Sequence, residues 1–212
     1  MRTAARFAVG LRLEDVAVAR GGRTILADVS LTLAPRETLL VKGRNGAGKT
    51  TLLRAIAGLL PVERGRIALT NAGSEAQDRR GHAIYAGHAD ALKPALTVRE
   101  NLAFWAKLHR APIARIEEAL AALDLASLAD QPAARLSAGQ KRRAGLTRLV
   151  LSGKPLWLLD EPAAAIDADS LARLTGLVKA HCDKGGAAII ATHDRISLPS
   201  ARAVIVGPEA TA

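Results

Sequence analysis

Apolar and polar positions alternate along the N-terminal part of the chain, as they do in strands with one buried face. The segments LRLEDVAVA (11–19) and TILADVSLTL (24–33) show this pattern and are separated by the turn residues Gly21 and Gly22. The apolar run TLLVKG (38–43) then predicts a fully buried strand that leads into a glycine-rich loop. The N-terminal part is therefore predicted to be mainly β structure.

Helical spacing of apolar residues begins directly after that loop. The segment KTTLLRAIAGLL (49–60) predicts a helix that ends near Gly58 and Pro61. A hairpin-like segment at 63–71 and a strand around AIYAG (83–87) follow it. The order of strand, loop and helix indicates the start of an α/β arrangement.

The middle of the chain changes to helical periodicity without strands. Residues 97–135 show this spacing, interrupted at Pro112 and closed at Pro132, which predicts helices over 97–110 and 113–129. A further helix is expected from about Ala138 to Leu151. We therefore predict an inserted α-helical subdomain at roughly 97–151.

Strands and helices alternate again after the insert. PLWLLD (155–160) and AAIIATH (187–193) are continuous apolar runs, the segment 169–182 between them is helical, and RAVIVG (202–207) is a last short strand. Continuous apolar strands that alternate with helices indicate a parallel sheet covered on both faces. The expected fold class is α/β, with a mainly parallel sheet flanked by helices, in a single domain at 1–212.

The composition places the chain among soluble globular proteins. Hydrophobic residues make up 49% and charged residues 24% of its 212 residues. No apolar run reaches the roughly 18 residues that a membrane-spanning helix needs. The single cysteine, Cys182, excludes an internal disulfide and fits a reducing compartment. We therefore expect a cytoplasmic protein.

The formal net charge of +10 raises the possibility of a nucleic-acid partner. The basic residues are scattered, however, and the chain contains only two Trp, one Tyr and two Phe, so platforms for base stacking are scarce. We expect no nucleic-acid partner. An anionic membrane face or simple solubility explains the charge instead.

A loop between a predicted strand and a predicted helix fits a phosphate-binding pattern. GRNGAGKT (43–50) matches G-x-x-x-x-G-K-[ST], in which glycines turn backbone N–H groups toward phosphates at a helix N-terminus. Lys49 is expected to reach the β- and γ-phosphates of ATP, and the Thr50 hydroxyl to ligate Mg²⁺. The predicted nucleotide-binding residues here are Gly43, Arg44, Asn45, Gly46, Ala47, Gly48, Lys49, Thr50 and Thr51.

Two later apolar strands end in residues that can act on a phosphate. Asp160, at the end of the first strand, can hold Mg²⁺ through water, and Glu161 can polarise an attacking water molecule. His193, at the end of the second strand, can hydrogen-bond the γ-phosphate. The alternatives are an acidic cap of the next helix and a purely structural histidine.

A second helix start can also accept an anion. In LSAGQKRRAGLTRL (136–149), the Ser137 hydroxyl and the backbone around Gly139 precede an amphipathic helix. Ser137 can equally serve as the cap of its own helix, and both roles can hold at once.

Five motifs, in workable order and spacing, resemble those of the nucleotide-binding subunit of ABC transporters. They are GRNGAGKTT (Walker A), LSAGQ (the signature motif), LWLLDEP (Walker B with the catalytic Glu), AAAID (the D-loop) and ATHD (the H-loop). The resemblance covers nearly the whole chain and implies an ATPase with the ABC type of P-loop NTPase fold, including an N-terminal antiparallel β part.

The resemblance explains why one chain has two phosphate-binding helix starts. In that family two domains pair head to tail, and each ATP lies between one chain's P-loop and the other chain's signature motif. It therefore implies a homodimer in which Ser137, Gly139 and Gln140 contact the partner's nucleotide. It also places Asp167 of the D-loop among the nucleotide-binding residues.

Two positions depart from the family pattern. Arg20 stands where the family has an aromatic that stacks on adenine; a guanidinium plane can stack as well, or Arg20 can simply face solvent. His88 stands where the family has a Gln that senses Mg²⁺ and the γ-phosphate. The resemblance makes His88 a candidate nucleotide and metal contact, and a tolerated surface substitution is the alternative.

His88, LTVREN and the short segment after His193 are similar to one branch, the ATPase of the haem exporter in cytochrome c maturation. This similarity implies hydrolysis of ATP on the cytoplasmic side of the inner membrane, docked on integral-membrane subunits and acting on haem-pathway proteins indirectly. Two alternatives stay open. They are the ATPase of an exporter for another small substrate and, more distantly, a soluble ABC protein that acts on nucleic acid.

Overall fold

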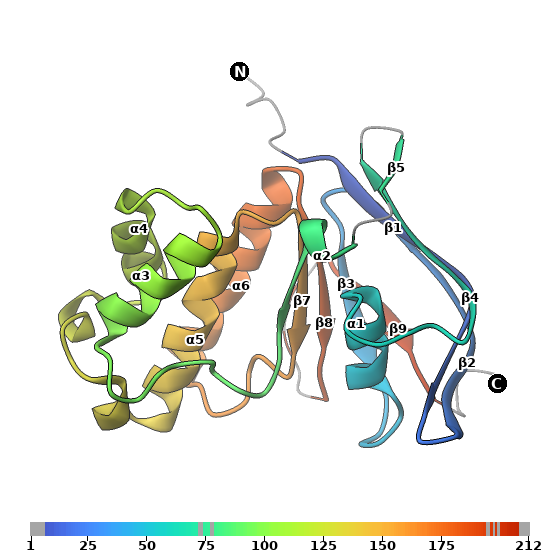
Figure 1. The fold of residues 1–212 in the computed structure, drawn as a ribbon, viewed down its shortest axis with the longest axis horizontal. Coiled ribbons are helices and arrows are strands. Elements are labelled where there is room, and N and C mark those ends of the chain that lie inside the picture. The colour runs from blue at the N-terminus through green and yellow to red at the C-terminus, as the bar shows by residue number, and fades with distance from the viewer. Residues whose placement is uncertain are drawn as a thin grey trace. The chain divides into compact units, whose positions relative to one another are not determined.

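The computed structural model describes residues 7–71, 74–76, 79–193, 196, 198 and 200–207. The chain forms two compact units, whose elements are drawn in Figure 1. The first unit comprises Met1–Tyr85, Lys154–Glu161 and Val178–Ala212, and the second comprises Ala86–Gly153 and Pro162–Leu177. The predicted helical segment 97–151 lies within the second unit, while its bounds as a subdomain and the single domain at 1–212 stay predictions.

An antiparallel sheet opens the first unit. Its strands are β1 (Val9–Arg20), β2 (Arg23–Leu33), β4 (Arg64–Asn71) and β5 (Ser74–Ala76), in the order β2-β1-β4-β5. The turn between β1 and β2 is made by Gly21 and Gly22, whose φ angles of 59° and 74° favour glycine. The antiparallel N-terminal part is thereby confirmed, and the structure adds β5 to it.

A five-stranded sheet forms the rest of this unit's β structure, in the order β6-β7-β8-β3-β9. Its strands are β3 (Thr38–Lys42), β6 (Ala83–Ala86), β7 (Leu156–Asp160), β8 (Ala187–Ala191) and β9 (Arg202–Ile205), and the short helix α2 (Arg79–His82) precedes β6. β3 runs parallel to β8 and β9, and β7 runs parallel to β8. β8 ends at Ala191, opposite Asp160, so the predicted strand end at His193 is two residues too late.

One apolar core joins both sheets to the helix α1 (Lys49–Ile56). Leu13 of β1, Val41 of β3 and Leu52 of α1 are at most 2% exposed, and each such side chain contributes about 1.5–3 kcal/mol by its burial. Because β3 and α1 are both anchored in this core, the glycine-rich loop between them has two fixed ends.

Three helices pack together in the second unit. They are α3 (Val98–Leu108), α4 (Ala114–Ala122) and α5 (Ala138–Ser152), accompanied by 3₁₀ turns at Ala126–Leu128 and Ala133–Arg135. The prediction of one helix over 113–129 is wrong at its C-terminal end. Asp124 has a left-handed φ of 54°, so the chain turns there and Leu125 packs into the core from the following segment. The helix α6 (Ala168–Asp183) begins in this unit and ends in the first.

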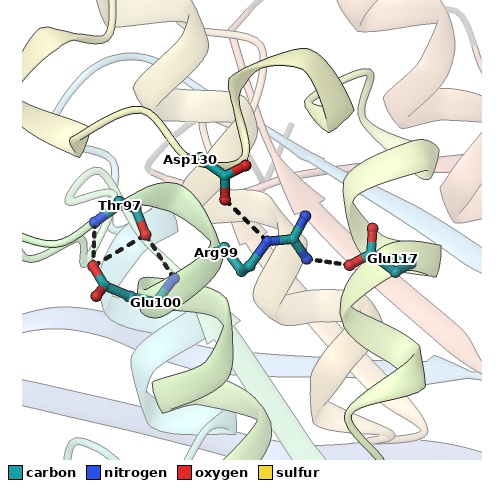
Figure 2. A network of polar contacts seen from close by, with 5 residues as sticks. All are labelled: Thr97, Arg99, Glu100, Glu117 and Asp130. Carbon is teal, nitrogen blue, oxygen red and sulfur yellow. Dashed lines mark hydrogen bonds and ion pairs between the residues drawn. The ribbon is translucent and has the colours of Figure 1, made fainter.

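Polar contacts fix the start of α3 and its neighbours, as Figure 2 shows. Thr97 caps α3 through a capping box with Glu100, whose carboxylate accepts a 2.8 Å hydrogen bond from the Thr97 backbone. Arg99 pairs with Glu117 of α4 and, at 3.2 Å, with Asp130. These pairs are exposed, so each contributes little to stability.

A buried histidine stacks against β7 in the first unit. The rings of His181 and Trp157 lie 3.9 Å apart at 10°, and His181 Nε2 donates a 2.9 Å hydrogen bond to the Pro155 carbonyl. Burial is the main cause that lowers the pKa of His181 from 6.5 to about 4. Hydrogen bonds to the backbone of Pro155 and Ala187 raise this pKa, and the nearby charge of Lys184 lowers it slightly. The folded protein therefore holds this imidazole neutral.

Acid is expected to destabilise the protein through this residue. Between pH 6.5 and pH 4 the unfolded chain binds a proton at His181 that the folded protein does not. The free energy of unfolding should therefore fall as the pH drops through this window, by about 3 kcal/mol in all. Denaturant unfolding from pH 7 to pH 4 measures it, with His181→Gln as the control that flattens the slope. Equal slopes in parent and variant would contradict the assignment.

Candidate functional site

The loop between β3 and α1 has the conformation of a phosphate-binding loop. Gly43, Gly46 and Gly48 have φ angles of 147°, 83° and 94°, which residues with a Cβ rarely adopt. A Cβ on Gly48 would also lie 2.6 Å from a methyl carbon of Leu26. Glycine is therefore needed here for conformation and for space.

The N-terminus of α1 is open to an anion. No side chain caps it, and no acidic residue lies in its first turn. Lys49 is 7% exposed, and its Nζ donates hydrogen bonds to the carbonyls of Gly43 (2.8 Å) and Arg44 (3.2 Å). The ammonium group is thereby held against the loop that would surround the phosphates of a nucleotide.

Two oxygen-bearing residues of the first unit suit Mg²⁺. Thr50 lies in the first turn of α1, and Asp160 ends β7 with 1% of its surface exposed. Hydroxyl and carboxylate oxygens are the ligands this hard cation takes, usually one or two from the protein and the rest from phosphates and water. The residues therefore fit the metal. Among the described residues, no group of three His, Cys, Asp or Glu side chains could hold a metal ion by itself.

Glu161 and His193 form a close pair at the carboxyl ends of β7 and β8. His193 Nδ1 lies 2.9 Å from Glu161 Oε1, and the His193 backbone N–H donates to Oε2 at 3.4 Å. The Glu161 side chain is 10% exposed and the His193 side chain 57%. Because a carboxylate can only accept, Nδ1 carries the proton that faces it. The pair can hold a water molecule and accept its proton.

The signature segment caps its own helix. Ser137 Oγ accepts a 3.2 Å hydrogen bond from the Gln140 N–H, and Gln140 Oε1 accepts one of 2.9 Å from the Ser137 N–H. A Cβ on Gly139 would lie 2.8 Å from the Ala165 carbonyl of the D-loop, so glycine lets these two motifs of the second unit approach closely. The capping role left open by the sequence is real, and an anion-binding role is compatible with it.

Sequence comparison decides the family. A family model described as ABC transporter matches residues 26–164. The chain is 48% identical over 198 residues to the "Cytochrome c biogenesis ATP-binding export protein CcmA" of Paracoccus denitrificans, an alignment that covers 93% of this chain and 89% of the relative. The chain belongs to the ABC transporter family. A second protein with that name, from Ruegeria pomeroyi, is also 48% identical and is covered to 91%.

This ABC ATPase has the same fold as solved ATP-binding subunits of ABC transporters. It matches the ATP-binding subunit of an ABC transporter with a TM-score of 0.81 and 24% identity, over 93% of this chain and 85% of that one. An ATP-binding cassette in its ADP conformation matches with a TM-score of 0.77 and 22% identity, over 94% and 87%. The predicted ABC type of P-loop NTPase fold is thereby confirmed.

The predicted site residues of this ABC ATPase fall into two groups. The first unit contains the P-loop residues 43–51, Arg20, Asp160, Glu161 and His193, and the second contains His88, Ser137, Gly139, Gln140 and Asp167. Asp194 of the H-loop lies outside the described residues. The roles of both groups at a nucleotide stay predictions.

Three of these residues, Arg20, His88 and Asp167, lie outside the clusters described above. Arg20 is exposed at the end of β1, and His88 is exposed in the loop after β6. Asp167 accepts a 2.7 Å hydrogen bond from the Ser170 N–H and so caps α6. Hydrogen bonds from the backbone and side chain of Ser170 lower the pKa of Asp167, which keeps it ionised.

Tyr85 is a site residue that the sequence did not indicate. Its hydroxyl donates a 2.8 Å hydrogen bond to Asp160 Oδ2 and accepts one of 3.4 Å from Arg54 of α1. Burial raises the pKa of Tyr85, with the Asp160 carboxylate adding to the rise, so the phenol keeps the proton it donates. Its position was a weak signal, since Tyr85 lies in the predicted strand 83–87, three residues before His88.

Tyr85→Phe is expected to weaken both stability and metal use. The change removes one hydrogen bond to a charged carboxylate, so the free energy of unfolding should fall by about 1–3 kcal/mol. Asp160 also loses the contact that sets its orientation, so half-maximal ATPase activity should need several-fold more Mg²⁺. Denaturant unfolding and Mg²⁺ titration at saturating ATP measure the two effects. Parent values in both would show that the Tyr85 hydroxyl does not position Asp160.

Proposed function

We propose that this chain is the ATP-hydrolysing subunit of a membrane ABC complex that serves cytochrome c maturation by haem export or delivery. The hydrolytic part is supported by the Glu161–His193 pair, which shares a unit with a phosphate-binding loop. The pathway is supported by 48% identity, over 93% of the chain, to proteins named for cytochrome c biogenesis and ATP-binding export.

The proposed reaction is in-line attack of water on the γ-phosphate of ATP. The N–H groups at the start of α1 and the Lys49 ammonium bind the phosphates. Glu161 accepts the proton of the water, and His193, oriented by its contact with Glu161, hydrogen-bonds the γ-phosphate. Mg²⁺, held by Thr50 and Asp160, would neutralise charge on the β- and γ-phosphate oxygens. The place of His88 in the family pattern supports it as a further contact of the γ-phosphate.

The proposed assembly is a head-to-tail homodimer that binds two ATP molecules. Each nucleotide is held by one chain's residues 43–51 and by Ser137, Gly139 and Gln140 of the other chain, with Asp167 in the same interface. The second helix start supports this assembly, since the chain has two helix starts that suit a phosphate group, one in each unit.

The proposed location is the cytoplasmic face of the inner membrane, on integral-membrane subunits of the complex. None of the helices that the structure describes is both long and apolar enough to cross a membrane. Haem-pathway proteins would be affected indirectly, through the membrane subunits. The alternative is the same ATPase chemistry in an exporter of another small substrate.

Deletion of the gene in its host, followed by haem staining of membrane proteins, distinguishes the cytochrome c pathway from an exporter of another small substrate. The expected result is loss of c-type cytochromes, restored by the parent chain but not by the Lys49→Ala variant. Normal c-type cytochromes after deletion would remove the pathway assignment and favour a different exporter. ATP turnover by the purified protein tests the enzymatic part independently.

A further inference from the structure

A buried arginine on α5 holds the loop that carries His88. Arg142 is 5% exposed, and its Nη1 donates a 2.7 Å hydrogen bond to the Gly87 carbonyl. The same nitrogen lies 3.5 Å from the His88 carbonyl and 3.5 Å from Asp90 Oδ1. One guanidinium group thus contacts three of the four residues in the loop 87–90.

A second contact on the same face of α5 fixes this loop by shape. Gly145 lies three residues after Arg142, close to one helical turn further along. A Cβ on Gly145 would lie 2.5 Å from the Asp90 carbonyl oxygen and 2.8 Å from the Asp90 Cα. The loop therefore lies directly on the helix, attached by charge at Arg142 and by close packing at Gly145.

The same helix carries the signature segment at its start. α5 runs without interruption from Ala138 to Ser152, and Ser137 is its N-cap. Arg142 lies within the first two turns of this helix, so a rigid element five residues long joins it to Ser137. A displacement of the loop 87–90 must therefore move the N-terminus of α5, or break the hydrogen bond to Gly87.

We propose that Arg142 is a positioning residue that makes the His88 loop and the signature segment move as one body. This inference rests on the proposed function. There His88 contacts the chain's own ATP and Ser137 contacts the ATP held by the partner chain. Arg142 then links the two nucleotides of the dimer through one helix.

The neighbouring arginine on α5 provides a matched control. Arg143 donates hydrogen bonds to the carbonyls of Leu123 (2.9 Å) and Asp124 (2.8 Å), which follow α4. It therefore attaches the same helix to a different part of the same unit, and its side chain is also largely buried, at 14% exposed. Arg142→Gln and Arg143→Gln each remove a guanidinium that binds backbone carbonyls, but only the first releases the His88 loop.

Kinetics of the full-length protein test the proposal. Arg142→Gln is expected to lower kcat for ATP by roughly ten- to 100-fold, because a displaced contact group costs rate, while the affinity for ATP stays near that of the parent. Arg143→Gln is expected to lose comparable thermal stability with little loss of kcat. Arg142→Lys, which keeps a charge able to reach the Gly87 carbonyl, should recover part of kcat and tests the proposal if the Gln variant fails to fold.

A double-mutant cycle with His88→Ala shows whether Arg142 acts through the loop. If it does, Arg142→Gln should cost little further kcat once His88 is absent. The proposal would be overturned if the kcat losses of Arg142→Gln and His88→Ala multiply in the double variant. Equal kcat losses in Arg142→Gln and Arg143→Gln would also overturn it. A parent protein that binds but does not hydrolyse ATP would overturn the proposed function itself, which separates the two failures.

Discussion

Replacing Glu161 with Gln is expected to stop ATP turnover while ATP binding persists. Gln keeps the shape of the side chain and an oxygen that can face His193 Nδ1, now 2.9 Å from Glu161 Oε1, but an amide cannot accept the proton of the attacking water. Loss of a general base lowers kcat by roughly 100- to 10,000-fold. Phosphate release and ATP binding, measured on the same preparation, separate the two effects.

Glu117→Gln is a suitable control for this experiment. Its carboxylate pairs with Arg99 on the surface of the second unit, so the same chemical change there should leave turnover near the parent rate. ATP-bound Glu161→Gln protein is further expected to accumulate as a dimer in size-exclusion chromatography. Hydrolysis by Glu161→Gln at the parent rate would show that another group activates the water.

Replacing Lys49 with Ala is expected to abolish ATP binding at concentrations that saturate the parent. The Lys49 ammonium is buried against the phosphate-binding loop, where it donates to the carbonyls of Gly43 and Arg44. Its removal takes away a cation at the phosphates and also two hydrogen bonds that shape the loop. Truncating one partner of a buried charge pair costs about 2–5 kcal/mol, so affinity should fall by roughly 100-fold or more.

Lys42→Ala is the matched control, because Lys42 ends β3 immediately before the loop and its side chain is exposed. Titration calorimetry with ATP should give parent affinity for Lys42→Ala and no measurable binding for Lys49→Ala. A thermal melt of each variant verifies that the fold is intact. Parent affinity in folded Lys49→Ala would mean that the nucleotide is held elsewhere on the protein.

The sequence predicted most of the elements because burial imposes a period on apolar residues. β7 and β8 are buried at every position, and their continuous apolar runs identified them. The end of α4 was missed because no residue in ALDLASLA strongly disfavours a helix. The chain turns at Asp124, and both neighbours, Leu123 and Leu125, are buried in the core. Helix and strand ends depend on such tertiary packing.

The parts of the site that lie close in sequence were also predictable. The phosphate-binding loop is one continuous segment, so its glycines and Lys49 could be assigned from spacing alone. The hydrogen bond from Tyr85 to Asp160 joins positions 75 residues apart, which no local pattern reveals. Arg142 lies in a basic run that is typical of a solvated surface, and it is buried because Gly87, 55 positions earlier, supplies a carbonyl for it.

The two tryptophans of the chain are divided evenly, since Trp157 lies in the first unit and Trp105 in the second. Each indole stacks on a histidine, at 3.9 Å for His181 and 5.8 Å for His109. Tryptophan emission, excited at the red edge of absorption where Tyr85 does not absorb, would therefore come from the first unit alone in Trp105→Phe and from the second unit alone in Trp157→Phe. Each half of this ATPase thus contains an intrinsic optical probe, with which the melting of one half can be followed independently of the other without an attached dye.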